Sequence, residues 1–187
     1  MIDLIKTKPV AMILIFFGAV ACTDPEIPEI INQEEVITTI LVRLTPENGG
    51  ETAVLSYRDL DGNGPNAPVL ETDQLQANTE YSGEIVLLNE TLNPAEIVTE
   101  EVAEEGTDHQ FFYATTAAMN LQYADADENG NPIGILFNLQ TGNPSSGSLT
   151  IVLRHEPNKL AEGVQNGEIE NAGGETDLSV TFGITVE

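Results

Sequence analysis

The chain lacks tryptophan, has only 5% aromatic residues and carries a single cysteine, Cys22. One cysteine excludes a disulfide within the chain. A core without tryptophan must come mainly from valine, isoleucine and leucine, and the β-branched members of that set favour strands. Because 41% of the 187 residues are hydrophobic, the chain can still bury the core of one domain.

Positive charge is equally scarce. Six lysines and arginines stand against 31 aspartates and glutamates, which gives a formal net charge of -25. A surface of that sign repels phosphate backbones, so nucleic-acid binding is excluded, and it attracts cations, basic proteins and divalent metals. High acidity is also typical of a surface that is simply well solvated, so both interpretations stay open at this point.

Catalytic signatures are missing as well. The sequence contains no G-x-S-x-G elbow, no P-loop and no glycine-rich dinucleotide motif after a strand. The paired carboxylates of a glycoside hydrolase cannot be recognised by spacing in so acidic a chain. Such enzymes line their sugar clefts with aromatic side chains, and these are few here. We therefore expect a protein that is not an enzyme.

The first 21 residues have the order of a secretory signal peptide. Lys6 and Lys8 precede an apolar run over residues 9–21, which ends in small residues. The run is shorter than the roughly 20 residues that span a bilayer as a helix. We expect residues 1–21 to be a signal peptide rather than a permanent membrane anchor.

Cys22 supplies an anchor of another kind. Residues 19–22 (AVAC) resemble the bacterial lipobox, in which the cysteine thiol receives lipid. Residues 22–34 form an acidic, proline-bearing tether that resembles the surface-export signal of Bacteroidetes lipoproteins. The resemblance implies an outer-membrane lipoprotein, surface-exposed or facing the periplasm. The alternatives are ordinary cleavage that leaves a spare thiol, and a tether that is only a spacer.

From residue 35 onward the pattern is one of short β-prone runs separated by glycine, asparagine, aspartate and proline. Turn signals at intervals of about 8 to 12 residues are typical of a β-sandwich. We predict an all-β, immunoglobulin/fibronectin-like β-sandwich over residues 35–187. Its strands are expected near residues 36–44, 52–58, 69–74, 80–89, 110–115, 120–124, 134–139, 148–154 and 177–186.

One helix interrupts the strands. Asn93, Pro94 and Glu96 have the spacing of an N-cap, a first-turn proline and a capping-box glutamate, and Gly106 ends the apolar stripe. The sequence predicts a short crossover helix between these points. Just before it, residues 75–81 resemble the loop and tyrosine that open a strand in fibronectin type III domains, where the phenol of the tyrosine, here Tyr81, bonds upstream backbone.

Two loops present oxygen atoms at alternate positions. Calcium takes six to eight oxygen ligands, so such loops are candidate Ca²⁺ sites. Neither loop has the glutamate that closes an EF-hand at its twelfth position, and hairpin turns select the same residue types. The candidate ligands are Asp59, Asp61 and Asn63 in the first loop and Asp125, Asp127 and Asn129 in the second.

The two histidines, His109 and His155, each stand beside a carboxylate at the end of a predicted strand. Brought together with Asp108 or Glu156, they offer the nitrogen and oxygen ligands that hold Zn²⁺ or Cu²⁺. The alternative is that both rings are hydrogen-bonded within the fold. Convergence of the two histidines in space distinguishes a metal site from a scattered pair.

Several segments together resemble a group of small Bacteroidetes lipoproteins. They are residues 34–39 (EEVITT), 57–64 (YRDLDGNG), 87–91 (LLNET), 108–113 (DHQFFY), 153–157 (LRHEP) and 171–177 (NAGGETD). Members are often labelled "type 1 periplasmic binding fold superfamily protein". That label names two doubly wound α/β lobes, whereas one helix without β-α-β alternation predicts a sandwich here.

The same group tends to accompany TonB-dependent outer-membrane receptors. The resemblance therefore implies a lipid-anchored binding or accessory protein of the cell envelope that assists such a receptor in nutrient or metal capture. The alternative is a structural or adhesive surface lipoprotein without a small-molecule ligand.

Overall fold

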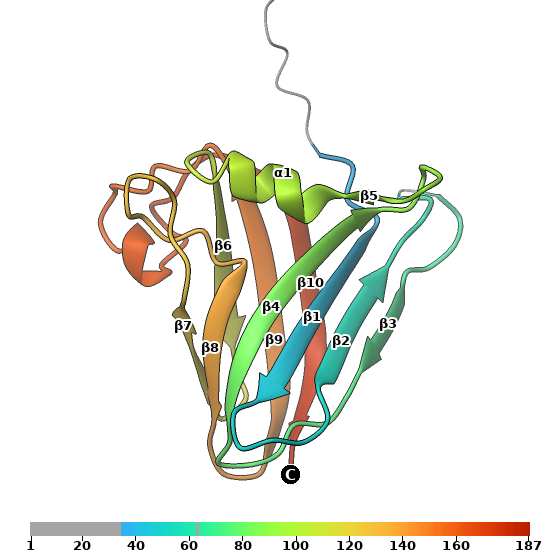
Figure 1. Cartoon of the computed structure of the whole chain (residues 1–187), viewed down its shortest axis with the longest axis vertical. Helices are drawn as coiled ribbons and strands as arrows, with labels where there is room; N and C mark the ends of the chain where they lie inside the picture. The colour runs from blue at the N-terminus through green and yellow to red at the C-terminus, as the bar shows by residue number, and fades with distance from the viewer. Residues whose placement is uncertain (1–34, 63) are drawn as a thin grey trace, which may run out of the picture. The chain divides into compact units, whose positions relative to one another are not determined.

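The structure is a computed structural model that describes residues 35–62 and 64–187 (Figure 1). The predicted signal peptide, the predicted lipidation residue Cys22 and the predicted tether over residues 22–34 lie outside the described residues. So does Asn63, one of the candidate calcium ligands.

Two antiparallel sheets make up the described part of the chain. The first has the strand order β3-β2-β1-β4-β8-β7, with β5 pairing with β4, and the second has the order β10-β9-β6. The strands are β1 (Thr39–Pro46), β2 (Ala53–Arg58), β3 (Val69–Thr72), β4 (Glu80–Asn89), β5 (Glu96–Ile97), β6 (His109–Thr115), β7 (Met119–Tyr123), β8 (Leu136–Thr141), β9 (Ser145–His155) and β10 (Glu175–Val186).

The sheets pack face to face, with the second behind the first in Figure 1. In the central strands β1, β4, β9 and β10 alternate residues point inward, because successive side chains of a strand face opposite sides of its sheet. Ile40, Val42 and Leu44 of β1 and Leu149 and Ile151 of β9 are completely buried in the shared core. The predicted all-β sandwich with one short helix is confirmed.

The helix α1 (Val98–Glu104) leads from β4 of the first sheet to β6 of the second, as a crossover should. It begins later than the capping box at Asn93 predicts. Glu96 and Ile97 instead form β5, which pairs with the end of β4, so tertiary strand pairing overrides the local helix signal. Val98 and Val102 bury the inner face of α1.

The described residues contain no helix long and apolar enough to cross a membrane.

The corner before β4 is built as the fibronectin-like segment suggests. The Tyr81 hydroxyl accepts a hydrogen bond of 2.8 Å from the backbone N–H of Gln76, five residues upstream. The ring of Tyr81 is buried in the core. The phenol thus satisfies a loop amide while its ring stays among apolar neighbours.

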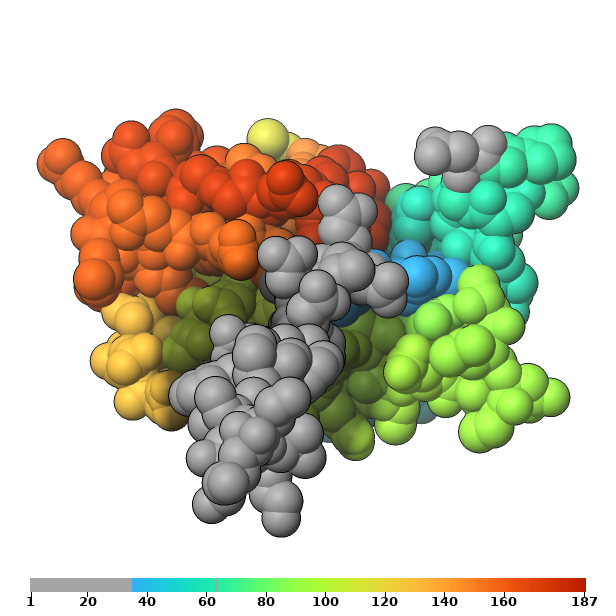
Figure 2. Space-filling model, turned by 90° about the horizontal axis from the view of Figure 1, so that it is seen from above, coloured from blue at the N-terminus to red at the C-terminus, as the bar shows by residue number. Residues whose placement is uncertain are grey.

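A long excursion over residues 156–174 separates β9 from β10 and contains the 3₁₀ turn Val164–Asn166. Its Val164 and Ala172 pack with Phe112 on the outer face of the second sheet, away from the main core. Figure 2 looks onto the end of the sandwich at the top of Figure 1, and the excursion forms one side of that view in orange to red. The excursion covers the strands that carry both histidines.

Candidate metal site

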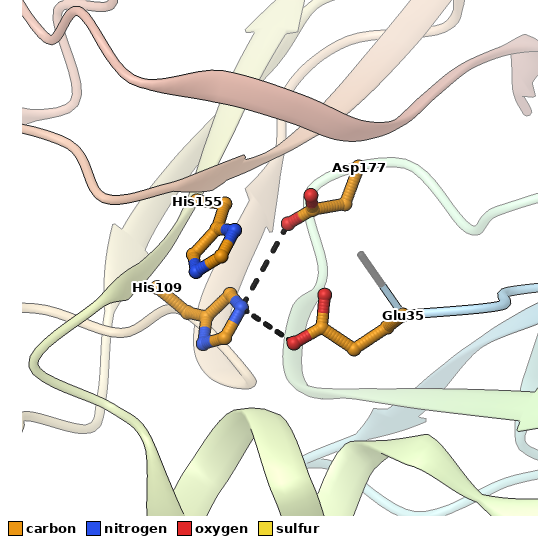
Figure 3. Close-up of side chains that lie close together, drawn as sticks. All are labelled: Glu35, His109, His155 and Asp177. Atoms are coloured by element: carbon orange, nitrogen blue, oxygen red, sulfur yellow. Dashed lines mark ion pairs between the residues drawn. The ribbon is translucent and has the colours of Figure 1, made fainter. Parts of the chain in front are cut away.

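The two histidines meet at one end of the second sheet. His109 is the first residue of β6 and His155 the last of β9, and the two are direct cross-strand partners. Their rings stack with centroids 4.9 Å apart and an angle of 10° between planes (Figure 3). The sequence left open whether the two histidines converge or lie apart, and in the structure they lie side by side.

Asp177 joins them from β10. The pairing between β10 and β9 shifts register between Thr176 and Leu178, so Asp177 is the extra residue of a β-bulge. Regular alternation would place Asp177 outward, because Leu178 is buried in the core. The bulge redirects its side chain inward, where it is fully buried with an oxygen 3.8 Å from Nε2 of His109.

Glu35 completes the group from the other sheet's entry segment, four residues before β1. Its Oε1 lies 3.0 Å from Nε2 of His109, and its side chain is 4% exposed. The group therefore draws on four separate stretches of chain and consists of Glu35, His109, His155 and Asp177 (Figure 3).

The hydrogen bond on the other ring nitrogen defines what His109 offers the site. Nδ1 of His109 lies 3.2 Å from the backbone oxygen of Glu105, just after α1. Because a carbonyl oxygen only accepts, Nδ1 must carry the proton, so the Nε2 of a neutral ring presents a lone pair. That lone pair faces the carboxylate of Glu35, and such an arrangement is stable only with a proton or a cation between them. Metal-binding histidines are commonly oriented by this kind of backbone contact.

The surroundings favour positive charge. His109 is completely buried and His155 is 6% exposed, so water screens the two carboxylates of the group weakly. Burial raises the pKa of Glu101 on α1, and the charge of Glu35 raises it further. A negative potential in a buried, nitrogen- and oxygen-lined group attracts a divalent cation.

The spacing of the ligand atoms fits an ion after a small contraction. All of the four atoms lie within 4.8 Å of one another. Tetrahedral zinc with bonds of about 2.0–2.2 Å keeps its ligands roughly 3.4 Å apart, so the group must draw in by about 1 Å. The stacked rings also have to tilt out of their parallel arrangement, since an ion lies near the plane of each imidazole that binds it.

Asp108 and Glu156, the carboxylates next to the histidines in sequence, are not members of the described group. Neighbouring residues of a strand point to opposite faces, so a carboxylate adjacent to an inward histidine points elsewhere. The two residues are joined through their backbones, where the N–H of Glu156 donates to the oxygen of Asp108 at 2.6 Å. Glu35 and Asp177 are the carboxylates of the group, in place of Asp108 and Glu156 that the sequence suggested.

The first calcium candidate forms a turn stabilised by its own side chains. Oδ1 of Asp59 accepts from the backbone N–H of Gly62 at 2.9 Å, and Oδ2 of Asp61 accepts from the Asn66 side chain at 2.7 Å. These are contacts of an Asx-type turn. Calcium binding by this loop stays a prediction.

A lysine occupies the second calcium candidate. Oδ2 of Asp127 lies 3.0 Å from Nζ of Lys159, and both side chains are nearly buried. Asp125 accepts hydrogen bonds from the N–H groups of Gly134 and Leu136 at 2.7 and 2.8 Å. An ion at this loop would compete with the ammonium, so binding of Ca²⁺ here also stays a prediction.

Sequence reasoning found both histidines but missed Glu35 and Asp177. Glu35 is recognisable only once the entry segment is known to run beside the second sheet. Asp177 precedes the strand pattern Leu178, Val180 and Phe182 at an outward position, and nothing in that alternation announces a bulge.

No protein-family model, curated protein or solved structure significantly resembles the chain.

Proposed function

We propose that the protein is a lipid-anchored accessory protein of the bacterial cell envelope that binds a divalent transition metal, Zn²⁺ or Cu²⁺. The observation that carries the proposal is the buried group of two histidines and two carboxylates. Imidazole and carboxylate are ligands that zinc and copper accept, and the group contains no thiolate.

Three features of the group support binding over catalysis. His109 has its tautomer fixed by the Glu105 carbonyl, its Nε2 faces carboxylates, and the ligand side chains are nearly fully buried. A closed set of protein ligands is typical of a site that holds an ion, whereas a catalytic metal keeps a position open for substrate.

The lipid anchor is inferred from the sequence alone. The lipobox-like residues 19–22 would place lipid on Cys22, and the acidic tether over residues 22–34 would carry the sandwich away from the outer membrane. A TonB-dependent receptor is the partner that the resemblance to Bacteroidetes lipoproteins implies. The domain would then hold a metal ion close to a receptor.

Thermal melts of the purified chain with Zn²⁺, Cu²⁺ and Ca²⁺ test the metal assignment. Every sample carries Cys22→Ser, so that an unmodified thiol cannot bind the ion. An ion that binds the native state raises the melting midpoint by mass action. We expect Zn²⁺ or Cu²⁺ to raise it for the parent protein and not for a His109→Gln/His155→Gln variant.

The alternative function, a structural or adhesive lipoprotein, makes the opposite prediction. There the four side chains form only an internal ion-pair network. No transition metal would then raise the midpoint of the parent protein, and that result would replace the metal-binding proposal with the structural one.

A further inference from the structure

Glu35 differs from the other three members of the group in how the chain holds it. His109, His155 and Asp177 belong to β6, β9 and β10, which are joined by antiparallel pairing that continues on both sides of the bulge at Asp177. Glu35 belongs to no strand or helix and lies at the beginning of the described chain. Three ligands therefore stand on a rigid sheet, and one stands on a connecting segment.

Thr38 marks the point where that segment becomes fixed. Its backbone N–H donates to the oxygen of Leu88 at 3.0 Å, and its own oxygen accepts from the N–H of Asp59 at 2.8 Å. Its hydroxyl also accepts from the N–H of Glu90 at 2.9 Å. Residues from Thr38 onward are thus held by both neighbouring strands.

Residues 35–37, here called the strap, have no comparable hold. Among the described residues no backbone hydrogen bond involves Glu35, Val36 or Ile37. Val36 is 56% exposed, and only Ile37 packs partly against the core. Segments with few backbone hydrogen bonds and little apolar contact open at low free-energy cost.

The buried carboxylate of Glu35 is itself incompletely satisfied. Oε1 faces His109, but Oε2 is buried without a hydrogen-bond partner in the described part of the chain. A buried carboxylate oxygen without a partner is unfavourable unless a cation neutralises it. An ion between Glu35 and the histidines would remove that penalty and hold the strap closed.

We propose that the strap is the gate of the metal site and that Glu35 is the ligand that closes it. The proposal rests on the metal-binding function above. The other ligands are buried on paired strands, so an ion enters and leaves when the strap swings about Thr38. Residue 35 is also where the predicted tether joins the domain, so an occupied site fixes that junction and an empty site releases it.

Stopped-flow mixing with Zn²⁺ separates gating from simple ligation. We use the full chain with Cys22→Ser and compare the parent, Glu35→Ala, Glu35→Gln and the control Asp177→Asn, which removes a ligand from the rigid sheet. If opening limits entry, the observed rate of the parent levels off as zinc concentration rises. Glu35→Ala should abolish the plateau and bind at least tenfold faster at high zinc concentration.

The control should behave differently. Asp177→Asn should release zinc at least tenfold faster but keep the plateau of the parent, because its strap is intact. Glu35→Gln retains the volume of the side chain, and far-ultraviolet circular dichroism confirms that each variant is folded.

Amide exchange at Val36 and Ile37 supplies the second readout, and zinc should slow it at least tenfold in the parent but not in Glu35→Ala.

Two results overturn the gate. If the parent binds zinc with a rate that rises linearly, or if Glu35→Ala keeps the plateau, the strap does not control entry although the metal-binding function stands. If the parent binds no zinc, the gate falls, and if Cu²⁺ also fails to raise its melting midpoint, the proposed function falls with it.

Discussion

His109 and His155 are cross-strand partners at the end of the second sheet, and their rings stack with centroids 4.9 Å apart. Direct partners on adjacent strands have Cβ atoms only about 5 Å apart, so the pairing alone brings two imidazoles within reach of one ion. Everything else in the group is added around this pair: Asp177 by a bulge, Glu35 by the strap.

Substitution of the histidines should abolish tight zinc binding. His109→Gln and His155→Gln should each lower the zinc affinity by more than about 100-fold, since residues that merely orient a ligand are already worth 10–100-fold. Isothermal titration measures the effect. Asp108→Asn and Glu156→Gln are matched controls beside each histidine and should leave the affinity unchanged. Equal losses in the controls would show that the ligands were assigned to the wrong carboxylates.

The turn before β10 should be sensitive at one glycine and tolerant at its neighbour. Gly173 and Gly174 have φ of +61° and +68°, but a Cβ at Gly174 would lie 2.1 Å from the backbone oxygen of His155, whereas Gly173 has open space. Gly173→Ala should cost about 1 kcal/mol, the price of the left-handed conformation. Gly174→Ala should cost clearly more in urea denaturation and also weaken zinc binding. Equal costs would contradict this account of the turn.

Lys159 should be essential for the connections at this end of the sandwich. Its ammonium contacts the carboxylate of Asp127 and donates to the backbone oxygens of Gly106 and Pro132, thereby joining three segments. Burial lowers the pKa of Lys159. Lys159→Met leaves the nearly buried carboxylate of Asp127 without its cationic partner and should lower the free energy of unfolding by about 3 kcal/mol.

A second substitution tests the cause of that loss. Adding Asp127→Asn to Lys159→Met removes the uncompensated charge, so part of the stability should return in a double-mutant cycle. Purely additive losses would mean that the lysine acts through its backbone contacts alone.

Glu90 should give the protein a specific acid sensitivity. Its carboxylate accepts two hydrogen bonds from Arg58, at 2.9 and 2.8 Å, and one from Thr39 at 2.6 Å, linking β1 and β2 to the end of β4. The bonds from Arg58, followed by that from Thr39, lower the pKa of Glu90 from 4.5 to about 2. The stabilisation is complete above pH 4.5 and is lost as the pH falls toward 2.

Melting temperatures across this pH range check the assignment. Glu90→Gln should be less stable than the parent at pH 7 and should lose less stability between pH 4.5 and pH 2. Glu84→Gln is the control, because the ion pair of Glu84 with Arg43 is long, at 3.7 Å, and half exposed. Parallel curves for the parent and Glu90→Gln would contradict the role of Glu90.

The fold could be predicted from local patterns because the strands alternate regularly. The run predicted over residues 80–89 coincides with β4. The start of α1 could not be predicted, since pairing of Glu96 and Ile97 with the end of β4 is a tertiary contact that a capping signal does not include.

Only the two histidines of the site could be predicted from the sequence, for a similar reason. Two histidines in a chain with no cysteine in its folded part are visible in the sequence. The inward position of the Asp177 side chain depends on one extra residue in the pairing of β10 with β9. The position of Glu35 depends on where the chain enters the sandwich. Both are set by the assembled sheets rather than by neighbours in sequence.

X-ray absorption at the zinc edge tests the central claim most directly. For the Cys22→Ser chain loaded with one equivalent of Zn²⁺, we predict a first shell of imidazole nitrogen and carboxylate oxygen at about 2.0–2.2 Å, with two imidazoles resolved by their outer-shell scattering. His109→Gln should reduce the imidazole count to one. A zinc ion surrounded by six oxygens without imidazole, or a chain that binds neither Zn²⁺ nor Cu²⁺, would contradict the metal site.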